Sequence, residues 1–482
     1  MRLLNVNLYV RVAAILLALG SGSATRAESS FTPGGLSDTE IRKLLVDRIG
    51  TGYHGVGIVV GVIGPGGRRV IPYGTAADGH VRTLDGDTVF ELGSVTKTFT
   101  GLLLADMVDK GEVQLSEPVQ ELLPASVHVP SRDGHVITLQ NLITNTSGLP
   151  DNPLSVDPTR YADFHLGYAA SVDQLYDLMN RIHLDIDPGS QIGHSNIGVG
   201  LLGQALALKS GMGYEKLLKV RITSPLGMRS TAVTQTPDMI SRRAVPHDAF
   251  LRPEVDLEMG ALLGAGGIKS TANDMLKLLA AELGYVKTPL KEAMATQVSA
   301  VRLPFGSFQM ALQVVISKGP AGDIVWTNGG TFGQQSFVGF DLQRRVGVVA
   351  LVNASGGARL VDDIGLHILA GAPLATVPPP PPPPPERRTI AVDASVLDRY
   401  VGQYQLTPAL AVRVFRDGSR LFAQLTGQDS YEIFPSSQTT FYWKVVDGQA
   451  TFEVDKSGLA ADLVMVEGGQ SMTARRIEST RH

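Results

Sequence analysis

Residues 378–385 of this 482-residue chain are eight consecutive prolines. Proline fixes φ and lacks an amide hydrogen, so neither a helix nor a central strand can run through this segment. We expect it to form a stiff polyproline II rod about 25 Å long. The rod would separate a large domain, residues 28–377, from a small domain, residues 389–482, with a linker over 378–388. Such a run can also be an SH3-type ligand, but we favour a spacer, because the start of the chain has the pattern of an exported protein.

The first 27 residues contain the three parts of a secretory signal peptide. Arg2 and Arg11 make the start basic, VAAILLALG is a short apolar run, and small residues precede possible cleavage after Ala24 or Ala27. A membrane anchor is the alternative, but the apolar run is too short to span a bilayer unaided. We therefore expect a periplasmic or secreted protein with no stable membrane span after cleavage.

Composition narrows the chemistry and the partners. The net charge is −4 with histidine neutral, and no basic block is present, so nucleic acid is not an expected partner. The absence of cysteine removes disulfides, a thiol nucleophile and cysteine-type zinc sites. The ten histidines form no H-E-x-x-H or H-x-H pattern, so we expect neither a metal nor a cofactor.

Short apolar segments between turn residues occur at both ends of the large domain and in the tail. In the tail, AVRVF, RDGSR and LFAQL read as a hairpin and indicate a small antiparallel all-β domain. The large domain is predicted to be α/β (α+β), with one antiparallel sheet made from both of its ends beside a helical subdomain. A cleft would lie where sheet and helices meet. Its predicted strands are 54–63, 68–74, 308–317, 324–330, 335–341 and 345–355.

The segment ELGSVTK, residues 91–97, places a serine near the start of a predicted helix and a lysine one turn behind it. The helix is indicated by an apolar stripe of Val95, Phe99, Leu102, Leu103 and Val108, and it should end near Asp109-Lys110-Gly111. The positive end of the helix stabilises an alkoxide on the serine and an oxyanion beside it. A buried lysine there is pushed toward its neutral form, and to act as a base its pKa must fall from about 10.4 to roughly 7–8.

Ser94 as a simple helix cap is the alternative, because S-x-x-K is a weak pattern in a chain of this length. Two further glycine-rich segments strengthen the catalytic interpretation. PGSQIGHSNIGVGLLGQAL, residues 188–206, puts His194-Ser195-Asn196 just before a predicted helix. WTNGGTFG, residues 326–333, lies at the end of a predicted strand, where glycines allow a substrate backbone to lie along the strand edge.

In this order the segments resemble the serine β-lactamase and penicillin-binding protein superfamily. The resemblance is closest to its class C β-lactamase branch, which has S-x-x-K, then Y-x-N, then K-T-G or H-x-G, and which includes D-Ala-D-Ala carboxypeptidases and esterases. LITNTSGLP, residues 142–150, is similar to the loop L-x-T-H-T-S-G-L-P of that branch. The resemblance covers about residues 38–372, and the tail resembles a small β domain often appended to such hydrolases.

The resemblance implies that Ser94 is the acylated nucleophile and that Lys97 accepts its proton. Asn196 would hold the substrate amide and Lys97, and the backbone N–H groups of Ser94 and Gly330 would form the oxyanion hole. The remaining positions implied to bind substrate are Thr327, Asn328 and Gly329.

Two positions depart from the family pattern. His194 stands where the family has tyrosine; a neutral imidazole can relay protons and act as a general base, so turnover should fall as the pH drops through about 6. A loop histidine in a decayed site is the alternative. Thr327 stands where a lysine or histidine would bind a carboxylate. The loss of a charge-assisted hydrogen bond, about 1.5–3 kcal/mol, disfavours anionic substrates.

We therefore expect an exported serine acyl-hydrolase of the class C β-lactamase type, acting on β-lactams or related amides through an acyl-enzyme. A carboxylesterase or a D-Ala-D-Ala carboxypeptidase on the same scaffold is the first alternative. A weakly catalytic or non-catalytic penicillin-binding or sensor protein is the second. The partner in each case is a small-molecule or peptide substrate.

Overall fold

The structure is a computed structural model of the whole chain. The expected signal peptide and the proline run lie outside its described residues, and the domain boundaries predicted beside them stay predictions. Two compact units are present: one contains a large sheet with its helices, the other the C-terminal strands. The described residues are 35–50, 56–77, 80–153, 170–248, 251–355, 360–374, 387–407, 410–425, 430–443, 448–456, 458–467 and 470–477.

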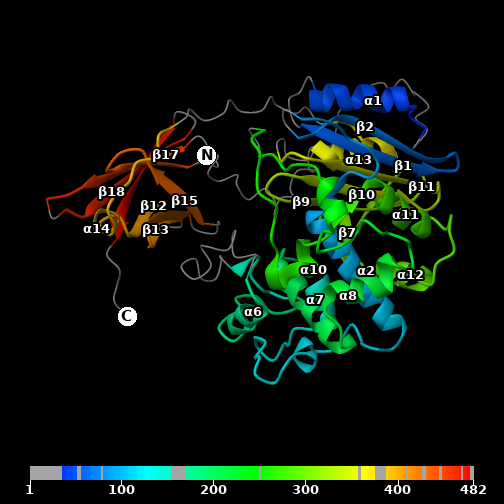
Figure 1. Cartoon of the computed structure of the whole chain (residues 1–482). Coiled ribbons are helices and arrows are strands. Elements are labelled where there is room, and N and C mark those ends of the chain that lie inside the picture. Colours follow the sequence, from blue (N-terminus) through cyan, green and yellow to red (C-terminus); the bar gives the residue numbers. More distant parts are fainter. Residues whose placement is uncertain are drawn as a thin grey trace, which may run out of the picture. The chain divides into compact units, whose positions relative to one another are not determined.

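An antiparallel sheet of nine strands forms the centre of the larger unit, in the order β3-β2-β1-β11-β10-β9-β8-β7-β6 (Figure 1). β1 (Gly57–Gly64) pairs with β11 (Val346–Val352), so that Ile58 lies opposite Val352. Both strands are buried and read as continuous apolar runs, as strands covered on both faces do. The prediction of one sheet made from both ends of the domain is therefore confirmed. The other strands are β2 (Gly67–Ala77), β3 (His80–Thr83), β6 (Leu303–Phe305), β7 (Phe308–Met310), β8 (Val315–Lys318), β9 (Asp323–Gly330) and β10 (Gln335–Asp341).

The single strand predicted over 308–317 is wrong, because the structure divides it into β7 and β8. Gln313 has a φ of +61°, a left-handed conformation that no strand can continue through. The Ala311 N–H bonds the Val314 carbonyl across the resulting turn, and the Gln313 side chain donates to the Ile143 carbonyl. The hydrogen bond to the helical part stabilises a conformation that the apolar sequence does not reveal.

Alternate residues of β10 pack on different helices, as the two-residue period of a strand requires. The ring of Phe337 lies directly on Gly365 of α13 (Leu360–Ala370). Val338 lies with Leu278 and Leu279 of α11 (Ala272–Glu282). α13 and α11 therefore cover opposite faces of the sheet, and α1 (Asp38–Leu45) lies against β2 (Figure 1).

The helix that begins behind Ser94 is α2 (Thr96–Asp109), and it ends at the predicted place, where Gly111 has a φ of +68°. The predicted apolar stripe is too narrow, since every residue from Thr96 to Met107 is buried. α2 is enclosed by α7 (Asn196–Ser210), α10 (Leu263–Gly266) and α12 (Lys291–Ser299), which makes it a core helix. The smaller α-helices of this part are α3 (Leu139–Ile143), α6 (Val172–Met179), α8 (Tyr214–Leu218) and α9 (Pro237–Ser241).

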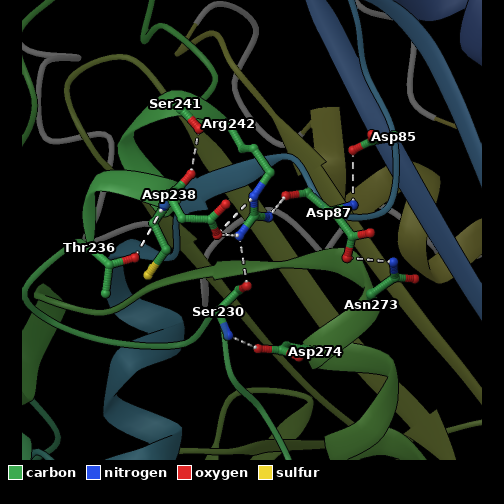
Figure 2. A network of polar contacts seen from close by, with 10 residues as sticks. Asp85, Asp87, Ser230, Thr236, Asp238, Ser241, Arg242, Asn273 and Asp274 are labelled. Carbon is green, nitrogen blue, oxygen red and sulfur yellow. Dashed lines mark hydrogen bonds and ion pairs between the residues drawn. The ribbon is translucent and has the colours of Figure 1, made fainter.

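An arginine-centred network fixes the segment that leads to Ser94 (Figure 2). Arg242 donates to the Asp238 carboxylate at 2.6 Å, to the Ser230 hydroxyl at 3.0 Å and to the Asp87 carbonyl. Asn273, near the start of α11, donates to the Asp87 carboxylate at 2.8 Å. These contacts hold the turn before β4 (Val89–Glu91), which pairs with β5 (Lys269–Thr271) and runs straight into the serine segment.

The smaller unit is a closed antiparallel barrel of eight strands, in the order β12 to β19. The barrel closes where β12 pairs with β19, with Gln403 opposite Ile477, and closure leaves no exposed sheet edge. Aromatic side chains fill it, and Tyr400 stacks on Phe452 with ring centroids 4.4 Å apart. The predicted all-β tail is confirmed, while closure was not predicted. The elements are α14 (Ala394–Leu397), β12 (Gly402–Thr407), β13 (Leu410–Asp417), β14 (Arg420–Leu425), β15 (Ser430–Pro435), β16 (Thr440–Trp443), β17 (Gly448–Val454), β18 (Ala460–Glu467) and β19 (Gln470–Ile477). Within the described ranges of the chain, no helix has both the length and the apolar character to cross a membrane.

Candidate active site

Ser94 and Lys97 face each other at the start of α2. Ser94 lies in a 3₁₀ turn, Gly93–Val95, and is partly exposed, whereas Lys97 is only 2% exposed. The Nζ atom of Lys97 lies 2.7 Å from the Oγ atom of Ser94 and also donates to the Ala265 carbonyl at 2.9 Å. A partly exposed serine is thus in hydrogen-bond contact with a buried amine, as the S-x-x-K spacing predicts.

The electrostatics of this pair suit proton transfer. Burial lowers the pKa of Lys97 to about 7, and the negative charge of Asp151 opposes that shift. Near neutral pH a large share of Lys97 is therefore an uncharged amine, which can accept the proton of the serine hydroxyl.

The end of β9 lies directly against the serine segment. A Cβ atom built on Gly329 would come within 2.8 Å of the Ser94 nitrogen, and one built on Gly93 within 2.5 Å of the Gly330 carbonyl oxygen. The Ser336 hydroxyl of β10 donates to the Leu92 carbonyl at 2.6 Å and holds the two segments together. The backbone groups of Ser94 and Gly330 are therefore neighbours, as an oxyanion hole made from them requires.

Gly93 is expected to be indispensable for this approach, since its φ is +50° and its Cα faces the Gly330 backbone. In Gly93→Ala the methyl group should push β9 away and lower the rate of Ser94 acylation about 100- to 1,000-fold, the typical cost of one oxyanion donor. Gly211→Ala is the matched control, because Gly211 has a φ of +65° but open space around it. The left-handed backbone should cost each variant about 1–2 kcal/mol of stability, and Gly93→Ala should lose more because its methyl group also clashes with the Gly330 backbone. Equal acylation rates in the two variants would contradict the proposed role of the close contact.

A second group of polar residues gathers at the start of α7. His194 Nδ1 lies 2.8 Å from Oδ1 of Asp151, and the Asn196 side-chain amide donates to the same oxygen at 3.1 Å. The backbone N–H groups of Asn196 and Ile197 donate to the Asp151 carbonyl at 2.8 and 3.1 Å. Ser195 caps the helix by accepting from Gly198 N–H, so the predicted loop-to-helix junction is confirmed.

Asp151 is the residue that sequence reasoning missed. It follows the LITNTSGLP segment by one position, and this adjacency is the signal that could have pointed to it. Burial opposes ionisation of its carboxyl, but the hydrogen bond and charge of His194, the charge of Lys97 and the Asn196 N–H outweigh burial and lower its pKa. An ionised Asp151 thus connects the His194 segment electrostatically to the serine–lysine pair.

Thr327 and Asn328 point to opposite faces of β9. Thr327 shares the face of Gly329, which is turned toward Ser94, and it lines a cavity of about 20 Å³ with Glu282. Burial raises the pKa of Glu282 to about 8. The Asn328 amide instead donates to Asp362 of α13 at 2.7 Å. Thr327 is therefore on the face of β9 that is turned toward Ser94. The Asn328 amide nitrogen is on the other face, where it bonds Asp362.

Glu91 holds the segment before Ser94 in place through hydrogen bonds to two other segments. Its carboxylate accepts from the Leu257 N–H at 2.7 Å, and its own N–H donates to the Gln334 side chain at 2.7 Å. Burial raises the pKa of this carboxyl, which is 5% exposed. Gln334 lies in the turn after β9. The hydrogen bond between Glu91 and Gln334 therefore links the segment before Ser94 to the end of β9.

Comparison with known proteins agrees with this geometry. The profile of the Beta-lactamase family matches residues 43–372, and that of a Domain of unknown function (DUF3471) matches residues 386–478. The class C β-lactamase of Rhodobacter sphaeroides has a similar structure, with a TM-score of 0.59 and 26% identity, covering 68% of this chain and 99% of that chain.

Two curated relatives carry names from the same group. D-alanyl-D-alanine-carboxypeptidase/endopeptidase AmpH of Escherichia coli K12 is 32% identical over 273 residues, which are 55% of this chain and 66% of AmpH. Penicillin-binding protein 4* of Bacillus subtilis is 25% identical over 428 residues, 84% of this chain and 91% of that protein. Because its Beta-lactamase match covers well over half of its length and the fold is that of class C enzymes, the chain belongs to the Beta-lactamase family of serine hydrolases.

Proposed function

We propose that this serine hydrolase is an acyl-hydrolase of the class C β-lactamase type, which cleaves β-lactams or related amides through an acyl-enzyme on Ser94. The observation that supports this most is the 2.7 Å contact between the Ser94 hydroxyl and the buried Lys97 amine. A helix cap would need no lysine there, and a buried ammonium without a carboxylate partner in direct contact would be costly.

In the proposed mechanism, Lys97 takes the Ser94 proton as Oγ attacks the substrate carbonyl carbon. The negative charge on the carbonyl oxygen is stabilised by the backbone N–H groups of Ser94 and Gly330. The C–N bond then breaks, the leaving nitrogen takes the proton that Lys97 accepted from Ser94, and the acyl group stays on Ser94. Attack by water on the ester carbonyl releases the acid and restores the serine. Asn196 holds the substrate amide while these steps proceed.

A carboxylesterase or a D-Ala-D-Ala carboxypeptidase on this scaffold is the second candidate, and Thr327 favours the esterase. Thr327 is an uncharged residue and offers only a hydroxyl to a substrate carboxylate. AmpH, a relative named as a carboxypeptidase/endopeptidase, supports the peptidase. Hydrolysis of nitrocefin, p-nitrophenyl acetate and a D-Ala-D-Ala peptide, measured side by side, separates these activities. Absence of all three hydrolyses would instead favour a penicillin-binding or sensor protein.

Thr327→Lys should shift the preference toward anionic β-lactams. An ammonium at this position can form a charge-assisted hydrogen bond with the carboxylate, worth about 1.5–3 kcal/mol, so the ratio of cephalosporin to neutral ester hydrolysis should rise about 10- to 100-fold. The neutral ester is the internal control, because a general change in the site would alter both rates. An unchanged ratio would mean that another group binds the carboxylate.

Location is part of the proposal. We infer from residues 1–27 that the protein is exported to the periplasm or secreted, where β-lactams and cell-wall peptides are found. Determination of the N-terminal residue of the mature protein tests this, with a start at Thr25 or Glu28 expected.

A further inference from the structure

The Oδ1 atom of Asp151 is the point at which the groups around the start of α7 converge. His194 Nδ1 lies 2.8 Å from it, the Asn196 amide donates to it at 3.1 Å, and the Asn196 N–H lies 3.4 Å away. The N–H groups at the start of α7 have other partners, because Ser195 Oγ accepts from the Gly198 N–H and the Asp151 backbone carbonyl accepts from the Asn196 and Ile197 N–H groups. The side-chain carboxylate is therefore not required to start the helix.

We propose that Asp151 is the positioning residue that makes His194 the base of deacylation, through the Nδ1–Oδ1 hydrogen bond. This inference rests on the proposed function and extends it to a residue that lies outside the three motifs. A carboxylate only accepts hydrogen bonds, so it holds the proton of the imidazole on Nδ1. The lone pair on Nε2 is then free to accept a proton.

The proton transfers of this step balance. Nε2 of His194 takes a proton from the water whose oxygen attacks the carbonyl carbon of the Ser94 ester. The imidazolium is stabilised by the Asp151 carboxylate. It then gives the proton to Ser94 Oγ as the ester C–O bond breaks, and the free acid leaves.

Asp151 has the opposite influence on acylation. Its negative charge raises the pKa of Lys97 and so works against the effect of burial. The charged groups that act on Asp151 are His194, from the segment before α7, and Lys97, from α2. Removal of the Asp151 charge should therefore lower the pKa of Lys97 further, so that the amine is neutral at lower pH. The same change should remove the group that keeps the proton of His194 on Nδ1. A residue with a purely structural role would slow both half-reactions together.

The experiment measures the two half-reactions of the full-length chain separately. A fluorescent penicillin reports the rate of Ser94 labelling from pH 5 to 9, and loss of the label reports deacylation. In Asp151→Asn the release of the label should slow about 100- to 1,000-fold, while the midpoint of the labelling profile moves to lower pH. Asp151→Glu should restore part of the release rate. Asp185→Asn, which removes the same charge at an exposed position of the same unit, should match the wild type in both rates.

Two further measurements separate positioning from loss of fold. In His194→Ala, addition of Asp151→Asn should cause no further loss of release, because the two residues act as one unit. The ¹⁵N chemical shifts of His194 should change from a protonated Nδ1 to a protonated Nε2 in Asp151→Asn.

The inference is overturned if Asp151→Asn releases the label at the wild-type rate, or if labelling and release fall equally without a shift in pH midpoint. Additive losses in the double variant would also contradict it. A wild-type protein that takes no label from penicillin, and none from p-nitrophenyl acetate or a fluorophosphonate, would instead overturn the proposed function itself.

Discussion

Ser94→Ala is expected to abolish covalent labelling and to lower turnover by a factor on the order of 10⁶, the loss seen when a serine hydrolase loses its nucleophile. Alanine leaves the 3₁₀ turn and the start of α2 unchanged but removes the atom that attacks the carbonyl. Lys97 would then have no serine proton to accept. Intact-protein mass after exposure to a β-lactam and to a fluorophosphonate measures the adduct directly, and its lifetime distinguishes a β-lactamase from a penicillin-binding protein.

The matched control is Ser270→Ala. Ser270 is a fully buried serine on β5, hydrogen-bonded to Thr231 at 2.7 Å, so its loss affects packing near the site without removing the proposed nucleophile. This variant should lose about 1 kcal/mol of stability and keep its adduct. An adduct of unchanged yield on the Ser94→Ala protein would show that another residue is acylated.

Lys97 is expected to govern how acylation depends on pH. Its pKa of about 7 means that the amine is mostly protonated below pH 7 and mostly neutral above it, so the labelling rate should rise as the pH increases through about 7. Lys97→Ala should slow labelling by a factor of about 10²–10⁴, the usual contribution of a positioned general base. Stopped-flow measurement of penicillin labelling from pH 5 to 9 provides both numbers.

Lys97→Arg separates a base from a simple positive charge. Guanidinium stays protonated throughout this range, so the variant keeps the cation and loses the proton acceptor. It should be as slow as Lys97→Ala, with a flat profile around pH 7. A rate close to that of the wild type would mean that Lys97 acts through its charge and would contradict its role as base.

The same buried amine has a consequence for stability. The pKa of Lys97 is lower in the folded protein than the ordinary 10.5, so between about pH 7 and 10.5 the unfolded chain binds the additional proton. The free energy of unfolding should therefore rise with pH across this window, and below pH 7 the penalty is fully present. The catalytic site is thus one at which function is obtained at the expense of stability.

The features that sequence predicts best are those set by local pattern. The β1–β2 hairpin, the helix behind Ser94 and its end at Gly111 follow from short-range periodicity and turn residues. The features that were missed depend on contacts between distant segments. The left-handed Gln313 is held by the Ile143 carbonyl, and the closure of the barrel joins β12 to β19, neither of which leaves a local pattern.

In the candidate active site, too, local features could be predicted and contacts between distant segments could not. The contact between Ser94 and Lys97 follows from their spacing on one helix, whereas the role of Asp151 needs the α7 segment to return beside it. Burial of α2 on all sides was not predicted, because Thr96, Thr98 and Thr100 are polar residues and polar residues usually lie on an exposed side of a helix. They are buried, and Thr98 and Thr100 bond the Gln313 and Gly264 carbonyls.

The pairing of β1 with β11 also fixes the order of events during synthesis. Ile58 leaves the ribosome long before its partner Val352, and at about 5–20 residues per second the interval is roughly 15–60 s. During that interval a fully apolar strand has no partner along one edge, and the central sheet cannot be completed. The newborn chain therefore has a long period in which a chaperone can bind it before the sheet is complete. The barrel pairs mainly consecutive strands, so its contacts are local and its folding should be faster.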